Sequence, residues 1–409
     1  MENALKVLYF HQHFVTPQGA GAIRSYAMAR KLIERGHSVT MVCGSNSSGT
    51  TGLRSSFSRG KRRGIVDGID VVELDLAYSN SDGFVKRVWT FLLFAIRSIR
   101  IALTEKYDVV FATTTPLTAG IPGIFARWLR KKPFVFEVRD LWPELPREMG
   151  VIKNPLVLWA MEVLEWASYR SADRLIGLSP GIVEGIRKRG VPAERIALIP
   201  NGCDLDIFSE KGEPWRPEGV RESDLLAVFA GTHGLANGLD AVLDAAKELK
   251  KRGRDDVKLV LIGGGKLKPA LQARAQRESL TNVVFHDPVK KADLAGLMRA
   301  ADLGMQVLAN VPAFYYGTSP NKFFDYIAAG LPVLNNYPGW LAEMIEEEQC
   351  GFAVAPADPV AFADALERAA NERDSLPGMG QRSKDLAQSR FDRNILSVQW
   401  VDWVAGVER

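Results

Sequence analysis

The stretch ALKVLYFHQHFVTPQGAGAIRSYAMARKLIERGHSVTMVCG, residues 4–44, decides the fold class. It begins with a short β-rich apolar run, turns through TPQGAGA, continues with helical spacing of its apolar residues to Gly36, and ends in a second apolar run. A strand, a loop, a helix and a second strand form the repeating unit of a parallel sheet with helices on both faces. We therefore predict an α/β protein of doubly wound, Rossmann-like type.

The same alternation continues along the chain and is interrupted once. Residues 196–224 are rich in Pro, Gly and charge and are interpreted as a linker, so we place a domain boundary near residue 205. The final residues, 391–409, are predicted to form a helix. Strands are expected in apolar runs at residues 69–75, 107–114, 133–140, 174–179, 225–231, 257–265, 283–287, 303–308 and 331–336.

Bulk composition excludes several classes of protein. A length of 409 residues suggests two domains, and a net charge of +4 does not point to a nucleic-acid partner. Three scattered cysteines without a CxxC predict a reducing compartment with neither a disulfide framework nor a metal site. No run of 18 uncharged apolar residues suggests a membrane span, and the N-terminus is interpreted as a strand and not a signal peptide. We expect a cytoplasmic protein.

The stretch SPNKFFDYIAAGLPV, residues 319–333, carries the most specific pattern of charge. Ser319, Asn321 and Lys322 would lie at the first turn of a helix, where free N–H groups and the helix dipole favour phosphate. Asp325 follows at the i, i+3 position and could accept both hydroxyls of a ribose. The alternative is an N-capped core helix with a surface Lys–Asp pair. Spacing alone leaves the two interpretations equal.

Two glycine-bearing loops follow strands and could each hold a ligand. Gly19 and Gly21 precede a helix whose N–H groups could bind an anion, with Arg24 in its first turn; a plain turn with an exposed Arg24 is the alternative. Gly263 and Gly264 follow the strand at residues 257–262 and permit close approach either of a nucleotide or of neighbouring chain.

Charged residues also gather at one strand end. In VFEVRDLWPELP, Arg139 and Asp140 follow a β-rich run, and such charges are costly unless they are paired or functional. The alternative is a structural pair between Arg139 and a carboxylate.

Residues 84–106 combine clustered apolar residues with Lys86, Arg87, Arg97 and Arg100. The uncharged run from residue 88 to 96 is too short to span a bilayer, but a basic amphipathic helix could lie in its interface. A helix packed on the sheet with solvated basic edges explains the pattern equally well.

Taken together, these motifs resemble the family-four retaining glycosyltransferases of GT-B architecture. The resemblance covers almost the whole chain and is closest to the bacterial O-antigen and capsule branch, which includes N-acetylfucosaminyltransferases. It implies two facing domains: 1–205 for the acceptor, 206–390 for the nucleotide sugar, and 391–409 crossing back to the first. Donor contacts would come from GTHGLANG and neighbouring loops, namely Gly231, Thr232, His233, Asn237, Gly263, Gly264, Val289, Ser319, Asn321 and Asp325.

The sequence departs from the family pattern at the expected site. The usual pair of glutamates is replaced by Gly317 and Asp325, and the usual Arg and Lys for the diphosphate fall at Thr232 and Asn237. Lys322 is the nearest replacement cation. Arg139 and Asp140 stand where the family often has His and Asp, and with Lys322 they are the predicted catalytic residues.

The resemblance implies transfer of a sugar from a UDP-sugar, with retention and without metal or other cofactor. Because Gly317 and Arg139 remove acceptors that usually contact hydroxyl groups, we predict an N-acetylated 6-deoxyhexosamine. The expected acceptor is a sugar on undecaprenyl diphosphate or another glycan of O-antigen or capsule, at the inner face of the plasma membrane, with no nucleic-acid partner. A UDP-sugar 2-epimerase and a non-catalytic sugar-nucleotide-binding protein are the alternatives.

Overall fold

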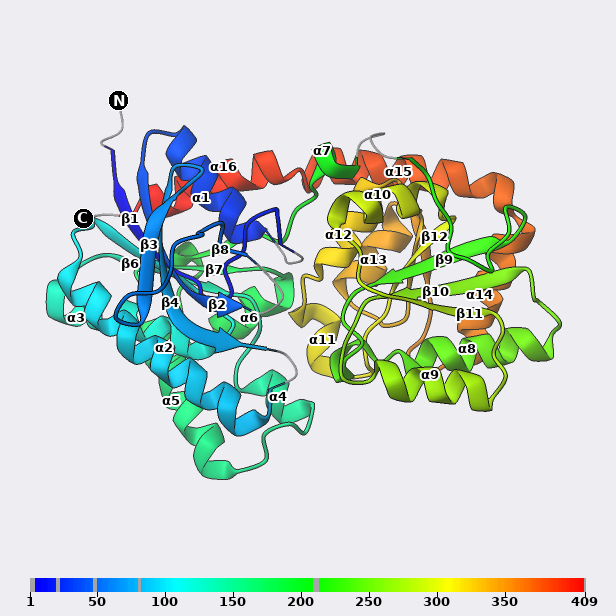
Figure 1. Ribbon diagram of the computed structural model, residues 1–409, viewed down its shortest axis with the longest axis horizontal. Coiled ribbons are helices and arrows are strands. Elements are labelled where there is room, and N and C mark those ends of the chain that lie inside the picture. Colours follow the sequence, from blue (N-terminus) through cyan, green and yellow to red (C-terminus); the bar gives the residue numbers. More distant parts are fainter. Residues whose placement is uncertain (1–3, 20–22, 47–49, 80–81, 209–212, 408–409) are drawn as a thin grey trace. The chain divides into compact units, whose positions relative to one another are not determined.

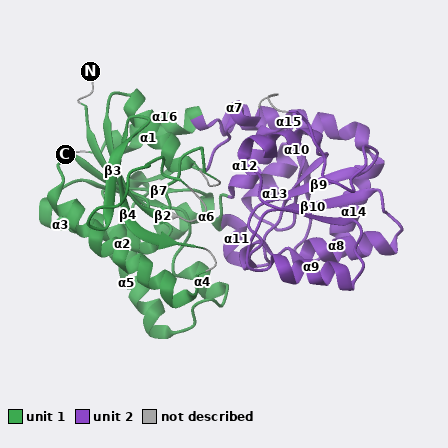
Figure 2. Ribbon diagram, in the orientation of Figure 1, with its two compact units in different colours: residues 1–200, 317–319, 394–409 green, residues 201–316, 320–393 purple. Residues whose placement is uncertain are grey.

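The chain forms two compact units (Figure 2). The computed structural model describes residues 4–19, 23–46, 50–79, 82–208 and 213–407. Unit 1 consists of residues 1–200, 317–319 and 394–409, and unit 2 of residues 201–316 and 320–393. Each unit is an α/β domain with its own sheet and core.

Unit 1 contains an eight-stranded sheet in the order β3-β4-β2-β1-β5-β6-β7-β8. All neighbouring strands pair in parallel except β3, which runs antiparallel to β4 at the edge. The central strands are buried on both faces, which explains why they appear in the sequence as continuous apolar runs. The strands are Lys6–Phe10 (β1), Ser38–Asn46 (β2), Lys61–Val66 (β3), Ile69–Tyr78 (β4), Val109–Thr113 (β5), Phe134–Val138 (β6), Arg174–Gly177 (β7) and Ile196–Leu198 (β8).

Helices cover both faces of this sheet (Figure 1). Helices α2, α3 and α5 pack side by side on one face, and α1 and α16 cover the other. Trp400 of α16 fixes that helix against the sheet, because its ring stacks on Tyr9 of β1 and meets Phe111 of β5 edge-on. The helices are Arg24–Glu34 (α1), Phe84–Thr104 (α2), Ile121–Arg130 (α3), Glu144–Glu148 (α4), Pro155–Ser171 (α5), Pro180–Lys188 (α6) and Arg393–Ala405 (α16), the last beginning at the final residue of unit 2.

Unit 2 contains a six-stranded parallel sheet in the order β11-β10-β9-β12-β13-β14. The strands are Leu225–Ala230 (β9), Val257–Ile262 (β10), Val283–His286 (β11), Leu303–Gln306 (β12), Val333–Asn335 (β13) and Gly351–Ala353 (β14). Helices α8, α9 and α14 lie on one face, while α10, α12 and α15 lie on the other (Figure 1). The helices are Leu205–Phe208 (α7), Asp240–Lys251 (α8), Lys268–Arg277 (α9), Lys291–Ala300 (α10), Pro312–Gly317 (α11), Asn321–Ala328 (α12), Trp340–Glu347 (α13), Pro359–Asn371 (α14) and Leu376–Arg390 (α15).

Strand order fixes where a ligand can bind in each unit. In unit 1 the chain starts at β1 and proceeds outward in both directions, so the order reverses between β1 and β5; in unit 2 it reverses between β9 and β12. Ligands of doubly wound sheets bind outside the carboxyl ends of the strands at such a reversal. The loops after these strands are therefore where a site is expected in each unit.

The predicted fold class is confirmed, but three strands were not predicted. β3 is an edge strand in which exposed residues alternate with half-buried ones and three of the six residues are charged, so it lacks an apolar run. β8 and β14 have only three residues each, and β8 lies in the stretch interpreted as a linker. Within the described residues, no helix combines the length and apolarity needed to cross a membrane.

Candidate functional site

In unit 2 the loops after β9 and β12 meet at the strand-order reversal. The backbone N–H of Ala309 donates to the carbonyl of Ala236 at 2.9 Å, which ties the two loops together. Gly238 is required there, because a Cβ at this position would lie 2.6 Å from the Cα of Ala309. Lys322 of α12 passes close to Gly231 at the end of β9, since a Cβ at Gly231 would meet the Lys322 Cε at 3.5 Å. The predicted donor loop and the predicted clamp helix are therefore adjacent.

The Lys322 ammonium group lies at the centre of this region. It donates to Asn237 Oδ1 at 2.9 Å and stands 5.3 Å from the centre of the Phe229 ring. Burial lowers the pKa of Lys322 to about 8. Among the described residues no carboxylate forms an ion pair with it, so its charge is balanced only by a neutral amide and a ring face. Such a cation is suited to bind an incoming anion.

The first turn of α12 adds backbone donors to this cation. Pro320 occupies the N-cap position, and no side chain caps the helix. The expectation of a side-chain N-cap is therefore wrong, because proline has no group that could accept from the first turn. The uncapped turn contains Asn321 and Lys322, while Ser319 just before it is buried. Uncapped N–H groups beside a buried ammonium favour phosphate.

The surface-pair alternative supposed an ion pair between Asp325 and Lys322. In the structure Asp325 pairs with Lys291 instead. Lys291 of α10 bridges two carboxylates, lying 3.4 Å from Asp325 and in an ion pair with Asp204. Arg393 also pairs with Asp204 and donates to the carbonyl of Gly202 at 2.6 Å. These three partners were not predicted from the sequence, because they lie between 34 and 121 residues from Asp325 along the chain and no local motif marks them.

The two carboxylates of this cluster differ in electrostatic state. Burial would raise the pKa of Asp204, but Arg393 and Lys291 outweigh it and hold the pKa below its usual value. Burial raises the pKa of Asp325 despite the nearby Lys291 ammonium, and the Asp204 charge adds to the rise. Asp325 is thus oriented by a cation but incompletely neutralised, with part of its surface still accessible. It remains able to accept hydrogen bonds from a ligand's hydroxyl groups.

The glycine loop after β10 approaches neighbouring backbone closely. A Cβ on Gly263 would lie 1.9 Å from the carbonyl oxygen of Gly231, and φ at Gly263 is +145°. The glycine at position 263 therefore allows the loop after β10 to pack closely against the loop after β9. His233 is fully buried beside it, and both ring nitrogens lack a partner among the described residues. Burial and Lys268 lower the pKa of His233 to about 4, so its ring is neutral at pH 7.

Arg24 of unit 1 is buried, unlike the exposed helix residue of the alternative interpretation. Its guanidinium donates to Glu137 Oε2 at 2.8 and 3.1 Å and to the carbonyls of Ile199 and Pro200 at 2.9 and 2.6 Å. Thr113 donates to the other Glu137 oxygen at 2.8 Å. Burial would raise the pKa of Glu137, but its contacts with Arg24 outweigh it and lower the pKa. Arg24 thus fastens β6 to the chain beyond β8.

The strand-order reversal of unit 1 gathers buried polar groups that lack partners. His11 Nδ1 and both amide atoms of Gln12, in the loop after β1, have none among the described residues. Burial lowers the pKa of His11 well below its usual value and that of His13 to about 4, with the Arg139 charge adding to both effects. Both histidines are therefore neutral at pH 7.

Arg139 lies beside these groups, in the loop after β6. Its backbone N–H donates to Thr114 Oγ1 at 2.8 Å, and its guanidinium forms no ion pair with a carboxylate in the described part of the chain. The alternative interpretation of Arg139 as one member of a structural ion pair is therefore wrong. Asp140 instead accepts from Thr115 Oγ1 at 3.0 Å, and burial raises its pKa. The Arg87 guanidinium of α2 lies 5.8 Å from the centre of the Tyr78 ring, which also contacts His13, and its charge lowers the pKa of His13 further.

Several other predicted residues have less decisive surroundings. Gly19 closes a turn by donating to Thr16, and Gly21 lies outside the described residues. The Thr232 carbonyl accepts from the Asn237 amide at 2.7 Å, and Val289 packs against the apolar core around β9 and β10. Gly264 accepts from the His233 N–H at 2.9 Å. Thr232, Asn237, Val289 and Gly264 remain predicted donor contacts, and Gly19 and Gly21 remain a predicted anion-binding loop.

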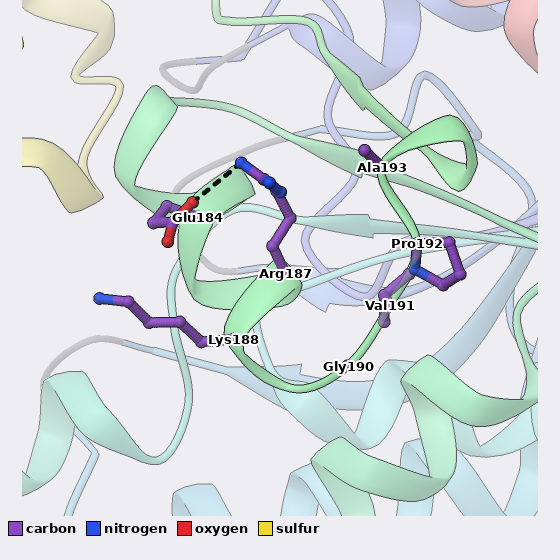
Figure 3. Close-up of a pocket in the computed structure, with 7 residues that line it drawn as sticks. All are labelled: Glu184, Arg187, Lys188, Gly190, Val191, Pro192 and Ala193. Atoms are coloured by element: carbon purple, nitrogen blue, oxygen red, sulfur yellow. Dashed lines mark hydrogen bonds and ion pairs between the residues drawn. The ribbon is translucent and has the colours of Figure 1, made fainter.

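A separate hollow of about 410 Å³ lies on unit 1 beside the end of α6 (Figure 3). Its wall carries Glu184, Arg187 and Lys188, with Glu184 and Arg187 joined by an ion pair at 3.3 Å. None of the predicted site residues lines it. The candidate site is therefore assigned from the strand-order reversals and their charged groups, and not from this hollow.

Comparisons with known proteins follow the division into two units. Residues 19–202 match the family model of the glycosyl transferase 4-like domain, and residues 224–372 match that of glycosyl transferases group 1. A D-inositol 3-phosphate glycosyltransferase from Xylanimonas cellulosilytica is 30% identical over 54% of this chain and 52% of its own length. The O-antigen chain mannosyltransferase C of Escherichia coli is 22% identical over 59% and 62%. The chain spans about half the length of the inositol phosphate relatives that it matches.

Solved structures share the fold over the full length. HepE from Anabaena, crystallised with UDP and glucose, superposes with a TM-score of 0.70 at 18% identity, covering 98% of this chain and 100% of HepE. At this identity the likeness shows the two-domain GT-B fold.

Proposed function

Because this chain belongs to the glycosyl transferase group 1 family, we propose that it transfers a sugar from a UDP-sugar to a glycan or lipid-linked acceptor of a surface polysaccharide. The family models support transfer over the UDP-sugar 2-epimerase and the binding protein. Relatives named for O-antigen and colanic acid synthesis support the polysaccharide context, and HepE, which was solved with UDP and glucose, supports the donor. The reaction would take place at the cytoplasmic face of the membrane, where UDP-sugars and undecaprenyl-diphosphate-linked acceptors are both available.

The contact between Lys322 and Asn237 carries this proposal. Asn237 stands where the resembling family has a lysine for the diphosphate, and the Lys322 Nζ lies 2.9 Å from the Asn237 Oδ1. A cation from α12 therefore occupies the region that the usual lysine would serve. With the uncapped first turn of α12, it supplies charge to a leaving diphosphate without requiring a metal.

Asp325 is proposed to accept the ribose hydroxyls. Its carboxylate is turned and held by Lys291, and part of it remains accessible. A carboxylate accepts two hydroxyl hydrogens at once, so the ribose would be bound next to the diphosphate on the same helix.

The cluster around Arg139 is the proposed acceptor subsite. Arg139 and Arg87 supply positive charge next to neutral His11 and His13, and the orphan atoms of Gln12 offer one donor and one acceptor. This combination suits a sugar joined to a phosphate, as in an undecaprenyl-diphosphate-linked acceptor. Asp140, whose pKa is raised by burial, is proposed to position the acceptor hydroxyl.

Transfer is proposed to retain the anomeric configuration by front-face substitution. The acceptor hydroxyl forms the new bond to the anomeric carbon as the bond to the UDP oxygen breaks on the same face. The hydroxyl proton passes to a phosphate oxygen of the departing UDP, whose negative charge Lys322 stabilises. This route requires no protein nucleophile.

The donor is expected to be an N-acetylated 6-deoxyhexosamine. A Cβ added at Gly317 would meet no atom within 4 Å, so this position offers open space where the resembling family has a glutamate. A hydrogen-bond acceptor at this position would be left unpaired by a deoxy sugar, at a cost of about 1–3 kcal/mol. Gly317 has no such side chain, so this cost does not arise. UDP-N-acetylfucosamine should therefore be transferred about ten- to a hundredfold faster than UDP-N-acetylglucosamine.

Radiolabelled donor screening measures this preference, with lipid-linked N-acetylglucosamine as acceptor and EDTA present. The Gly317→Glu variant is the matched control and should shift the preference toward the 6-hydroxy donor. Product that forms without acceptor would instead indicate an epimerase. Donor binding that yields no product, whether acceptor is present or absent, would indicate a binding protein. A faster rate with UDP-N-acetylglucosamine would contradict the deoxy preference while leaving transfer intact.

UDP affinity is expected to fall as pH rises from about 7 to about 9. Lys322 has a pKa of about 8, so the ammonium that attracts the diphosphate is lost across this range. The phosphate of UDP is already ionised there, because its last pKa lies near ~6. Calorimetric titration should show proton uptake on binding above the Lys322 pKa. The Lys322→Arg variant keeps its charge and should bind UDP independently of pH; an identical pH profile in both proteins would exclude Lys322 as the titrating group.

A further inference from the structure

The outward face of α2, α3 and α5 is apolar. The described residues include 21 exposed large hydrophobic side chains, of which six lie on α2, three on α3 and five on α5. Four of the side chains on these helices are indoles, each 60–63% exposed: Trp89, Trp128, Trp159 and Trp166. A helix that covers a sheet normally presents a polar face to water. Apolar exposure on this scale marks an interaction surface.

The exposed apolar residues follow helical periodicity. On α2, Val85, Trp89, Leu92 and Ile96 recur at intervals of three and four, so they form one stripe. The opposite side of α2 is buried on the sheet through residues such as Phe94. α5 repeats this arrangement, with its own exposed stripe and a buried side. Both helices are therefore apolar on two faces, and only one of these faces is covered by the described fold.

The three helices lie next to one another and form one continuous surface. α3 packs against both α2 and α5, so the three helices belong to one layer. Each helix connects parallel strands of the same sheet, so the three run in the same direction. Their C-terminal ends consequently lie on the same side of the unit.

Cations border this surface, and carboxylates are scarce. Residues 84–104 contain four Lys or Arg and residues 121–132 another four, and neither range contains Asp or Glu. Arg100, Lys131 and Arg170 are exposed at or just beyond the C-terminal parts of α2, α3 and α5, and none forms an ion pair within the described part of the chain. The two carboxylates of α5, Glu162 and Glu165, are each paired with an arginine.

This distribution of charge identifies the occupant. A second copy of the chain on the same face would bring like-charged borders together, which is unfavourable. An anionic lipid surface complements the cations, while its interfacial region accommodates indoles, which combine an apolar ring with an N–H group. Trp128 is already held in place, because its Nε1 donates to Ser171 at 2.8 Å while its ring stays exposed.

We propose that the outer face of α2, α3 and α5 is a membrane-contact surface, which inserts its tryptophans into the interface of an anionic bilayer without spanning it. The proposal does not rest on the sugar-transfer reaction. It extends the interfacial helix considered for residues 84–106 to two further helices that are remote in the sequence. The proposed partner is defined by its chemistry, namely a layer of anionic headgroups over an apolar interior.

Co-sedimentation of the full chain with vesicles tests the proposal. The protein should bind mixed phosphatidylglycerol and phosphatidylcholine vesicles at low salt, and binding should weaken steeply as salt increases. The Trp89→Ser/Trp166→Ser variant should lower the partition coefficient about tenfold or more on the same vesicles. Arg100→Glu/Arg170→Glu should weaken binding to the vesicles that contain anionic phosphatidylglycerol, but should not change binding to uncharged vesicles. Ile65→Ser, which removes an equally exposed residue on β3, should bind like the wild type.

A second measurement needs no variant and so does not depend on how the variants fold. Brominated lipids should quench the tryptophan fluorescence of the wild-type protein, because the indoles would lie at the depth of the bromine atoms. Absence of binding to anionic vesicles at low salt would overturn the proposal. It would also be overturned by a concentration-dependent dimer that Trp89→Ser/Trp166→Ser dissociates, since the face would then bind a second copy.

Discussion

Replacing Arg24 with alanine is expected to lower the free energy of unfolding by about 3–5 kcal/mol, because it removes one partner of a buried ion pair. The Arg24 and Glu137 side chains are 1% and 0% exposed. The substitution would leave the Glu137 carboxylate buried without its cation, and the carbonyls of Ile199 and Pro200 without their donor. Each loss has its own desolvation cost, so the effect should be near the upper limit for a single substitution.

Urea unfolding followed by tryptophan fluorescence measures this effect. Seven of the nine tryptophans belong to unit 1, so the signal reports mainly the unit that contains Arg24. Arg35→Ala is the control, because Arg35 forms an exposed pair with Asp402 near the end of the same helix and should contribute about 1 kcal/mol or less. The Arg24→Met/Glu137→Met variant should recover much of the loss, because it removes both buried charges.

The pH dependence of stability provides an independent check with a definite sign. Glu137 has a folded-state pKa below its usual value of 4.5, so its pair stabilises the fold above that value and the contribution is lost as pH falls. Arg24→Ala removes the largest influence that lowers the Glu137 pKa and leaves the smaller effects of Arg139 and Thr113, so acid should destabilise this variant less than the wild type. If Arg24→Ala keeps its stability but loses acceptor binding, the original prediction of a ligand contact would be correct instead.

The fold was predictable because its signal is local. Strands buried on both faces, such as β1 and β5, consist of uninterrupted apolar residues, and the helices between them follow their own period. β3 escaped prediction because an edge strand exposes one face and needs no apolar run. The pattern of residues 84–106 correctly showed clustered apolar residues, but periodicity alone could not distinguish the buried side of α2 from its exposed one.

The site was only partly predictable because its contacts are distant in sequence. Lys322 and Asp325 were identified from one helix, whereas their partners Asn237 and Lys291 come from other elements of unit 2. The glycines of the loop after β10 permit a close approach, but only the folded arrangement places the carbonyl of Gly231 against Gly263. Likewise, a basic residue after a glycine loop cannot reveal whether it faces a ligand or, like Arg24, a buried carboxylate.

Replacing Lys322 with alanine is expected to lower kcat by about 10²–10³-fold, or about 2.7–4 kcal/mol in transition-state stabilisation, the usual effect of losing a preorganised group that stabilises developing charge. The diphosphate gains negative charge as the glycosidic bond breaks, and Lys322 is a buried cation that forms no ion pair among the described residues. The loss should therefore affect kcat more than the KM for the donor, since charge accumulates mainly in the transition state.

Initial rates with saturating donor test this expectation against two matched variants. Lys322→Arg keeps the charge and should recover part of the rate. Lys247→Ala removes an exposed lysine paired with Glu278 at 3.6 Å and should leave the rate unchanged. A rise in KM alone for Lys322→Ala would show that the ammonium binds the nucleotide equally in the ground and transition states. Unchanged kcat and KM would show that another group supplies the positive charge, and that the Lys322–Asn237 contact only joins α12 to the loop after β9.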